Sequence, residues 1–374
     1  MRGHIRKRSK GSWTVVIDAG RDLNGKRRQV WRSVRGTKRD AEALLSQLIH
    51  ERNIGAEVVH PERMTVADFL RRWLNTYAKP NTAPRTYRRY EQLVRVNLTP
   101  HIGTIPLTKL RPLHIQDTYT RLLSEGLSAQ TVVHCHRVLK GALGRGCRWQ
   151  LLSRNPADSV DPPTPQRYQI PTLSLEDANR LLAIADETRY GTLVFVAALT
   201  GMRVGELCGL RWVDVDFDNG ALAVRQTLQW MSGEGFTTRQ PKTYRSTRPV
   251  SLGPDTIERL KDHRLKQLKE RLNVGAIYND NDLVFATTEG KPIHPSTLRA
   301  AWLKIAAESG LKMRLHDLRH LHASLLLRQG THPKIVSERL GHSTVGITLD
   351  LYSHTGPTLQ VQAATDLESL LANG

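Results

Sequence analysis

The second half of this 374-residue chain contains side chains that could together break a phosphodiester bond. That reaction requires an in-line nucleophile, a proton for the leaving oxygen and positive charge near the non-bridging oxygens. Arginine suits the last role because its planar fork can donate to two phosphate oxygens, and tyrosine can act as a covalent nucleophile. The candidate residues are Arg203, Lys242, His316, Arg319, His342 and Tyr352.

The sequence around these residues is distinctive. Arg203 follows Gly201 and begins a short predicted helix, whose free N–H groups also favour anions. His316 and Arg319 are three residues apart on a predicted helix and therefore share a face. Lys242 lies between two predicted strands. A lysine there is normally solvated, but near a scissile phosphate it could protonate a leaving alkoxide.

His316 and His320 are four residues apart, a spacing that also occurs in metal sites. The zinc-hydrolase pattern requires Glu directly after the first histidine, whereas this chain has Asp317, and no third ligand is evident. The His134–His136 stretch is interpreted as part of a helix surface. We therefore expect no metal ion and no other cofactor.

The net charge is +20, and its distribution is informative. Residues 1–60 carry +8, residues 65–165 carry +9 and residues 166–374 carry only +3. A polyanion such as DNA, which releases counterions on binding, is the partner that this excess favours. A basic surface kept for solubility, RNA and acidic membranes are the alternatives.

The composition is that of a globular protein, with 39% hydrophobic residues. The longest apolar run is too short to span a membrane. No apolar segment follows the basic first ten residues, so no secretory signal is expected. Three widely separated cysteines fit a reducing cytosol better than a disulfide framework.

The first 60 residues predict a small module of strands and one helix. Residues 12–19 and 26–34 are strand-like and flank an Asn24-Gly25 turn, and Thr37 caps a helix predicted over 38–52. A sheet of two or three strands of this size can enter a DNA groove; a basic structural appendage is the alternative. The predicted DNA contacts in this module are Arg21, Lys26, Arg27, Arg28 and Arg32.

Residues 65–155 are predicted to be all helical, starting at a capping box formed by Thr65 and Asp68. Further helices are expected over residues 84–96, 112–124 and 128–149. Arg85, Arg88 and Arg89 on the second helix are predicted DNA contacts, although the tyrosines between them are more often core residues. Residues 153–166 contain four prolines and are interpreted as an extended linker.

The rest of the chain predicts a mostly helical domain with a small β insert. Strand-like segments occupy residues 222–229, 237–240 and 248–252, and helices are predicted over 174–185, 191–199, 254–272, 295–309, 315–328 and 333–340. The fold class is thus multidomain α+β. Its predicted parts are an N-terminal β-sheet and helix module (1–60), an all-helical domain (61–155), a linker (156–168) and a mostly helical domain (169–374) with a tail from about residue 357.

These motifs resemble the tyrosine recombinase, or phage integrase, family in order and spacing, over nearly the whole chain. The resemblance is most specific at Thr200–Leu207, Pro241–Val250, Leu315–His320 and Leu340–Tyr352. It implies that Arg203, His316, Arg319 and His342 are catalytic, that Glu206 supports Arg203, that Lys242 is the general acid and that Tyr352 is the nucleophile. His320 matches a common but non-catalytic neighbour.

The resemblance also implies a mechanism. Tyr352 attacks a DNA phosphate, which forms a 3′-phosphotyrosyl bond and frees a 5′-hydroxyl, and the 5′-hydroxyl of a partner strand then attacks that bond. Neither ATP nor metal is needed. A homotetramer acts on two duplexes through a four-way junction, with each tyrosine expected to work in its own subunit.

Residues 12–52 look like the arm-type DNA-binding domain of phage and conjugative-element integrases, and residues 65–155 resemble the core-type domain. The expected function is integration and excision of a phage or mobile element at attachment sites with core-type and arm-type sequences. The expected place is the cytoplasm of a bacterial host of Gram-positive type, at the nucleoid, without membrane association. Whether an excisionase or a host DNA-bending protein is required stays open.

Three other functions remain as alternatives. A chromosome-dimer-type recombinase or resolvase has the same chemistry but usually begins at the helical domain. A type IB topoisomerase would relax DNA without joining two sites. A non-catalytic DNA-binding regulator would have no need for Lys242, His316 or Tyr352.

The C-terminal tail, from about residue 357, is expected either to dock on a neighbouring subunit or to pack on its own domain.

Overall fold

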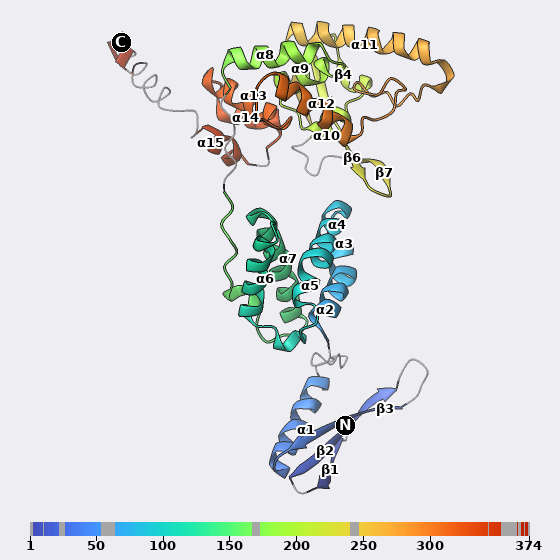
Figure 1. Cartoon of the computed structure of the whole chain (residues 1–374), viewed down its shortest axis with the longest axis vertical. Coiled ribbons are helices and arrows are strands. Elements are labelled where there is room, and N and C mark those ends of the chain that lie inside the picture. Colours follow the sequence, from blue (N-terminus) through green and yellow to red (C-terminus); the bar gives the residue numbers. More distant parts are fainter. Residues whose placement is uncertain are drawn as a thin grey trace. The chain divides into compact units, whose positions relative to one another are not determined.

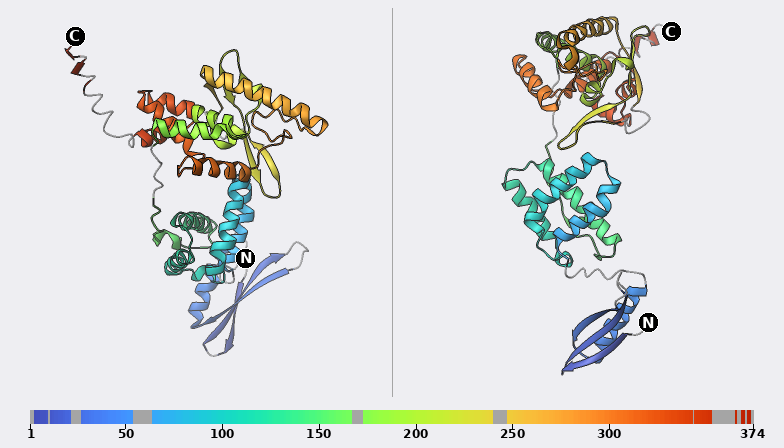
Figure 2. Two further views of the ribbon diagram at one scale, coloured as in Figure 1. Left: turned by 45° about the horizontal axis from the view of Figure 1, so that its top comes forward. Right: turned by 90° about the vertical axis from the view of Figure 1, so that its right-hand side faces the viewer.

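The computed structural model describes residues 3–9, 11–21, 27–53, 64–166, 173–239, 247–342, 344–352, 365, 368–369 and 371–372 (Figure 1). The chain forms two compact units, residues 1–167 and 168–374. The first contains a β-sheet module and a helical domain, and the second is mostly helical with small sheets (Figure 2). This architecture confirms the expected multidomain α+β fold class. The division into four parts at residues 60, 155 and 168 stays a prediction.

Three antiparallel strands and one helix form the N-terminal module. The strands are β1 (Gly3–Ser9), β2 (Ser12–Arg21) and β3 (Arg27–Arg35), in that order, and α1 spans Lys38–Asn53. The sequence analysis did not predict β1, because its only large apolar side chain is Ile5. Pairing with β2 holds this basic edge strand in place, and Ile5 packs into the module's core.

One face of this module's sheet is covered by α1, and the opposite face carries Val16, which is also buried. Val15 and Ile17 of β2 pack with Ala41 of α1. Because side chains alternate along a strand, the cross-strand partners of Val16 lie on the opposite face. Trp31 is one of them and is 55% exposed, with the Arg6 guanidinium 6.0 Å from its ring centroid.

Four helical stretches form the helical domain. α2 (Val66–Trp73) leads into α3 (Lys79–Asn81), and α4 (Pro84–Gln92) leads into α5 (Thr99–Ile102); α6 (Pro112–Ser124) and α7 (Ala129–Arg148) follow. These ranges confirm the helices predicted for this part of the chain. Phe69, Leu93, Tyr119 and Leu139 are among the buried residues of their common core.

The first two stretches each contain a π-helical turn, at Leu74–Ala78 and at Leu93–Leu98. Pro80 and Pro100 follow these turns, four residues after a carbonyl within each. Proline lacks the N–H for the usual helical hydrogen bond, and its ring clashes with the carbonyl four residues earlier. A wider turn before each proline relieves that clash without ending the stretch.

Part of the predicted linker packs onto this domain. Residues Pro156–Ser159 form a 3-10 turn, and Ala157 and Val160 are buried in the helical core. The side chain of Asn155 caps this turn by accepting from the Ala157 N–H at 3.0 Å. Extended chain therefore begins after Val160, later than the sequence analysis placed it.

The second unit is built around α9 (Gly191–Thr200), which is apolar on all sides and largely buried. Helices α8 (Leu175–Asp186), α12 (Pro295–Glu308) and α13 (Asp317–Arg328) contribute to the same core. A sheet of β4 (Val215–Asp216), β5 (Ala221–Val224) and β8 (Arg248–Ser251) also packs into it, in the order β4-β5-β8.

The strand predicted over residues 222–229 is wrong as a single element. β5 ends at Val224, and β6 (Thr227–Met231) pairs with β7 (Gly235–Arg239) in a separate hairpin. Between them, the Gln226 amide donates to the Gly209 carbonyl oxygen at 2.8 Å and Arg225 approaches Asp214. These tertiary contacts redirect the chain, and no local pattern signals them.

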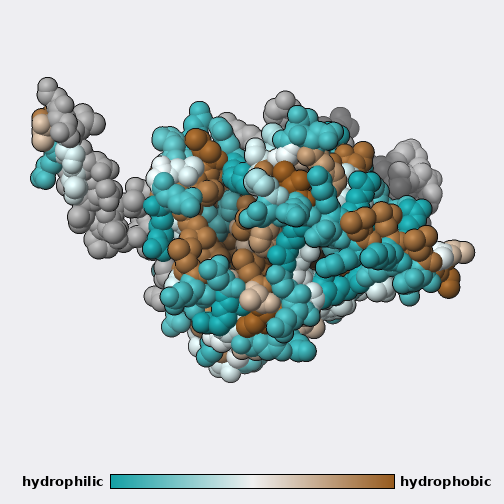
Figure 3. Space-filling model, turned by 90° about the horizontal axis from the view of Figure 1, so that it is seen from above, coloured by the Kyte–Doolittle hydropathy of each residue, from teal (hydrophilic) through white to brown (hydrophobic). Residues whose placement is uncertain are grey.

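The described part of this unit also contains α10 (Val204–Cys208), α11 (Pro254–Val274), α14 (Pro333–Leu340) and α15 (Gly346–Tyr352). The sequence analysis did not predict α15. On α11, Leu265, Leu268 and Leu272 are exposed, and Figure 3, which views the molecule from that side, shows apolar groups set among hydrophilic ones. Within the described residues, no helix is long and apolar enough to cross a membrane.

We predict that Thr65→Ala will destabilise the start of α2. The Thr65 hydroxyl accepts from the Asp68 N–H at 3.2 Å, and loss of such a cap costs about 1 kcal/mol. Hydrogen exchange of the α2 amides, followed by mass spectrometry, should become several-fold faster. Thr120→Ala is the control, because that hydroxyl bonds only to a carbonyl within α6. Equal exchange rates in the two variants would contradict the prediction.

Candidate active site

The site begins where α9 ends. Gly201 has φ +63° and reverses the chain, so that Arg203 stands at the start of α10. A Cβ at Gly201 would overlap Leu340 and lie 2.9 Å from Cδ2 of His322. Glycine is therefore required here for both its conformation and its size. This turn brings Arg203 against α13 and the end of α14.

Glu206 is a buried carboxylate that binds two arginines. Its Oε1 accepts from Arg203 Nη1 at 2.7 Å, and its Oε2 accepts from the Arg203 N–H at 3.0 Å and from Arg248 Nη2 at 3.1 Å. Burial opposes ionisation, but the charge and hydrogen bond of Arg248, together with the hydrogen bonds from Arg203, hold the pKa of Glu206 below its usual value. Glu206 is thus an anion that orients both guanidinium groups.

The end of α14 supplies the next contact. Gly341 caps this helix with φ +68°, and its carbonyl oxygen accepts from Arg203 Nη2 at 2.9 Å. His342 follows directly, and its Nδ1 lies 2.8 Å from the hydroxyl oxygen of Thr348. Thr348 belongs to α15 and is fully buried. The position of His342 is therefore fixed from both sides, by the α14 cap and by α15.

Arg319 is buried and incompletely bonded. Its Nη1 donates to the Gly201 carbonyl oxygen at 2.8 Å, whereas its Nη2 is buried without a hydrogen-bond partner among the described residues. Burial and then the charge of Arg203 lower the pKa of Arg319 to about 9, so it is still a cation at neutral pH. A buried donor beside a second cation favours an anionic ligand at this point.

His316 occupies the N-cap position of α13, without a side-chain capping bond, and has His320 beside it. The two rings are 5.7 Å apart and nearly perpendicular. Burial lowers the pKa of both, and the neighbouring cations Arg319 and Arg203 add to this effect for His316. The first turn of α13 is held by Asp317, which is buried and accepts from Arg314 Nη2 at 2.7 Å. His316 is therefore a neutral imidazole at neutral pH.

His342 is in a similar electrostatic setting. Burial and the charges of Arg319 and Arg203 lower its pKa to about 4. The charges of Arg319 and Arg203 also lower the pKa of His316. The structure thus brings together five of the predicted residues: Arg203, Glu206, His316, Arg319 and His342.

The other two predicted residues are not described in full. Lys242 lies outside the described residues, between β7 and β8. Of Tyr352 only the backbone is described, as the last residue of α15. Among the described residues, no three or more His, Cys, Asp or Glu side chains are arranged to hold a metal ion.

Two residues of the site, Arg248 and Thr348, were not predicted from the sequence. Arg248 lies on β8, where burial alternates along the strand and Val250 shares its buried side. This alternation could have shown that Arg248 points inward. The role of Thr348 had no comparable signal, because its contact depends on how α15 folds back onto His342.

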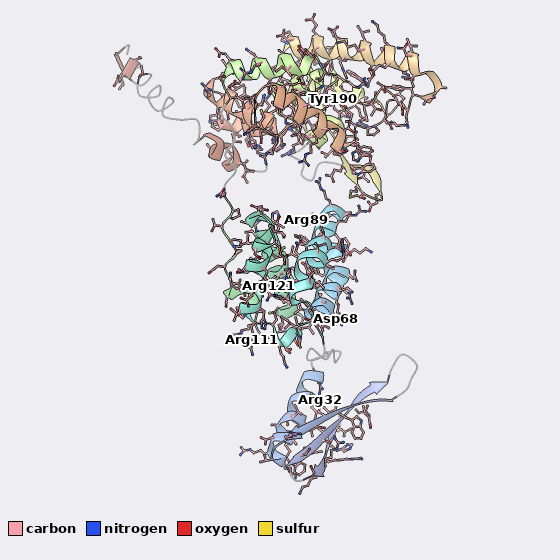
Figure 4. All side chains as sticks on the ribbon, in the orientation of Figure 1. Arg32, Asp68, Arg89, Arg111, Arg121 and Tyr190 are labelled. Carbon is pink, nitrogen blue, oxygen red and sulfur yellow. The ribbon has the colours of Figure 1, made fainter. Side chains whose placement is uncertain are left out.

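The structure describes some of the predicted DNA-contact residues and not others. Arg85 and Arg89 are exposed on α4, Arg88 is partly buried, and Arg32 lies on β3 (Figure 4). Lys26 and the side chains of Arg21, Arg27 and Arg28 lie outside the described part of the chain. The structure also shows a groove that the sequence analysis missed, of about 790 Å³, next to α7.

Basic and aromatic residues line this groove. The Arg145 guanidinium lies 3.8 Å from the ring centroid of Tyr77, and Trp73 stacks on Tyr90. The other basic residues of the groove are Arg137, Lys140, Arg148 and Arg154. Such a surface suits a phosphate backbone.

Comparison with known proteins identifies the family. The phage integrase family model matches residues 171–358, and the model of the phage integrase N-terminal SAM-like domain matches residues 65–123. A "Tyrosine recombinase XerC-like" protein of Caldanaerobacter subterraneus is 30% identical over 97% of both chains. The ICEBs1 integrase of Bacillus subtilis is 27% identical over 98% of this chain and all of that one. The chain belongs to the phage integrase family.

Solved structures show the same fold. The Tn1549 transposon integrase in complex with transposon right end DNA aligns with a TM-score of 0.71, at 20% identity, over 81% of this chain and 99% of that one. The lambda integrase tetramer bound to a Holliday junction aligns with a TM-score of 0.58, at 18% identity, over 94% and 95% of the two chains.

We predict that acid will destabilise the second unit through His322. Its Nδ1 donates to the Ala198 carbonyl oxygen and its Nε2 accepts from Arg339 Nε at 3.1 Å, so only the neutral ring fits. Burial and the charge of Arg339 lower its pKa to about 4. The pKa of the imidazole is higher in the unfolded chain than in the folded chain. The neutral ring therefore contributes its full stabilisation of the folded state above about pH 6.5, and this contribution is lost as pH falls towards 4.

The measurement is urea unfolding of the full chain at pH 7 and pH 4.5. His322 should account for up to about 3 kcal/mol of the loss, so His322→Gln should be less stable at pH 7 but less sensitive to acid. His134→Gln, at a partly exposed position of α7, is the control. An unchanged pH dependence in His322→Gln would contradict the assignment.

Proposed function

We propose that this chain is a site-specific DNA recombinase that integrates and excises a phage or mobile element through a 3′-phosphotyrosyl intermediate. The observation that carries the proposal is the buried Nη2 of Arg319, without a partner among the described residues, beside Arg203 and two neutral histidines. A DNA phosphate would supply both the missing acceptor and the missing negative charge. Family membership agrees with this reading.

Each of these residues would have a separate role in the reaction. Arg203 and Arg319 would bind the non-bridging oxygens, which gain charge as the phosphate is attacked. Tyr352 would attack phosphorus, the bond to the 5′ oxygen would break, and Lys242 would give that oxygen a proton. In the reverse step a 5′-hydroxyl attacks the phosphotyrosyl ester and displaces Tyr352. The ester keeps the bond energy, so no nucleotide cofactor is required.

The histidines would donate hydrogen bonds as neutral groups. The Thr348 hydroxyl can donate to His342 Nδ1, which would place the ring proton on Nε2, free to bond a phosphate oxygen. An imidazolium at this position would add a further charge to a cluster that already holds Arg203 and Arg319. The lowered pKa values of His316 and His342 therefore suit donors at neutral pH.

The other parts of the chain would hold the DNA. The face of the N-terminal sheet that carries Arg6 and Trp31 would bind arm-type sites, and the groove beside α7 would bind core-type sites. The proposal also includes assembly as a homotetramer on two duplexes and action at the nucleoid in the bacterial cytoplasm. It includes dependence on an excisionase or a host bending protein as well. One relative's XerC-like name favours a second candidate, a recombinase that resolves chromosome dimers. Assays of integration and of dimer resolution would separate the two.

The test of the mechanism uses a nicked suicide duplex. The duplex carries the core sequence that the protein selects from a random duplex library, and the reaction contains EDTA. We expect a covalent protein–DNA adduct on a denaturing gel, and none with Tyr352→Phe. Binding without an adduct from the wild-type chain would favour a non-catalytic DNA-binding regulator, and adduct formation in Tyr352→Phe would exclude Tyr352 as the nucleophile.

We predict that Arg145→Gln will weaken DNA binding similarly on selected and unrelated duplexes. Loss of one phosphate contact should reduce the slope of log affinity against log salt by about 1. Electrophoretic mobility shifts at several salt concentrations measure this slope. Arg180→Gln is the control, because Arg180 is an exposed arginine of α8 paired with Asp177. An unchanged slope in Arg145→Gln would remove Arg145 from the interface.

A further inference from the structure

Besides Arg319, the site contains a buried arginine that does not belong to the predicted catalytic set. This residue, on β8, contacts both α10 and α14. Arg248 stands at the start of β8 and is 6% exposed. Its Nη2 donates to Glu206 Oε2 at 3.1 Å, and its Nε donates to the Arg339 carbonyl oxygen at 2.6 Å. One guanidinium thus joins the carboxylate that orients Arg203 to the last turn of α14.

The contact at α14 fixes the residues that follow it. A helix ends with carbonyl groups that lack intrahelical partners and carry partial negative charge. Arg248 binds one such carbonyl, at Arg339, and Arg203 binds another, at Gly341. The fit is close, since a Cβ on Gly341 would lie 2.9 Å from Arg248 Nη1. His342 is the next residue, so its distance from Arg203 depends on both contacts.

We propose that Arg248 is a positioning residue, which holds Glu206 and the end of α14 so that Arg203 and His342 face one phosphate. This inference rests on the proposed function. Arg248 acts through Glu206 and the helix end and does not touch the reacting atoms.

Lysine cannot replace this arginine. The contacts to the Arg339 carbonyl oxygen and to Glu206 leave the guanidinium from different nitrogens, Nε and Nη2, and point to different elements. An ammonium group is a single point at the end of a flexible stem and would reach only one of the two acceptors in a fixed geometry. Arg248→Lys keeps the charge and tests the geometry, whereas Arg248→Met removes both.

The experiment measures three quantities for the wild type and the two variants. These are the single-turnover rate of adduct formation on the suicide duplex at saturating protein, the affinity for the same duplex, and the pH profile of the rate. We expect Arg248→Met to lower the rate about 100-fold and Arg248→Lys about tenfold, because small displacements of positioned groups have effects of that order. The DNA affinity should change less than threefold.

The pH profile separates positioning from general loss of structure. Arg248 lowers the pKa of Glu206, and the groups facing that carboxylate are Arg203 and Arg248. Without Arg248 the carboxylate will take up a proton at higher pH, so the acid limb of the rate should move to higher pH in Arg248→Met. Arg211→Met is the matched control, since Arg211 forms a two-bond pair with the buried Asp214 away from this cluster.

The outcomes are distinct. Adduct formation by Arg248→Lys at the wild-type rate, with the wild-type pH profile, would overturn the positioning role, and this variant retains the buried charge if Arg248→Met fails to fold. An equal shift of the acid limb in Arg211→Met would also overturn it. No adduct from the wild-type chain would overturn the proposed function and this inference with it.

Discussion

The active site depends on one buried carboxylate, Glu206, which binds two of three neighbouring arginines. Glu206 is the only acidic partner of Arg203 and Arg248 among the described ion pairs, and it has no direct bond to Arg319. Backbone carbonyls at two helix ends supply the remaining acceptors. The end of α9 binds Arg319 at Gly201, and the end of α14 binds Arg203 and Arg248. Helix C-termini suit this role because their last carbonyls are unpaired and partially negative.

This arrangement explains why both helices end in glycine. Gly201 and Gly341 have positive φ, and their carbonyl oxygens accept from Arg319 and Arg203 respectively. The two hydrogen bonds span 118 and 138 residues of sequence, so the site forms only when the whole second unit has folded. The polar groups are then oriented before substrate arrives, which is the condition under which electrostatic stabilisation of a transition state is most effective.

The sequence identified candidate site residues more completely than the tertiary contacts that hold them in place. Residue types and spacing pointed to Arg203, His316, Arg319 and His342, the family resemblance added Glu206, and hydrophobic patterns located most of the helices. Arg248 was overlooked because an isolated arginine on a strand has no local feature that reports a partner 42 or 91 residues away. The same limit applies to the break between β5 and β6, where contacts from Gln226 and Arg225 override a continuous strand pattern.

The cationic surroundings also determine what the histidines can do. Burial and the nearby arginines lower the pKa of His316 and His342, so each ring is neutral and holds one N–H near neutral pH. Such a ring can donate to a phosphate oxygen without adding charge to the cluster. A bound phosphate would have the opposite effect on the histidine pKa values, because its negative charge would stabilise protonated histidine as well as the Arg319 cation. Substrate binding should therefore raise the pKa values of both histidines.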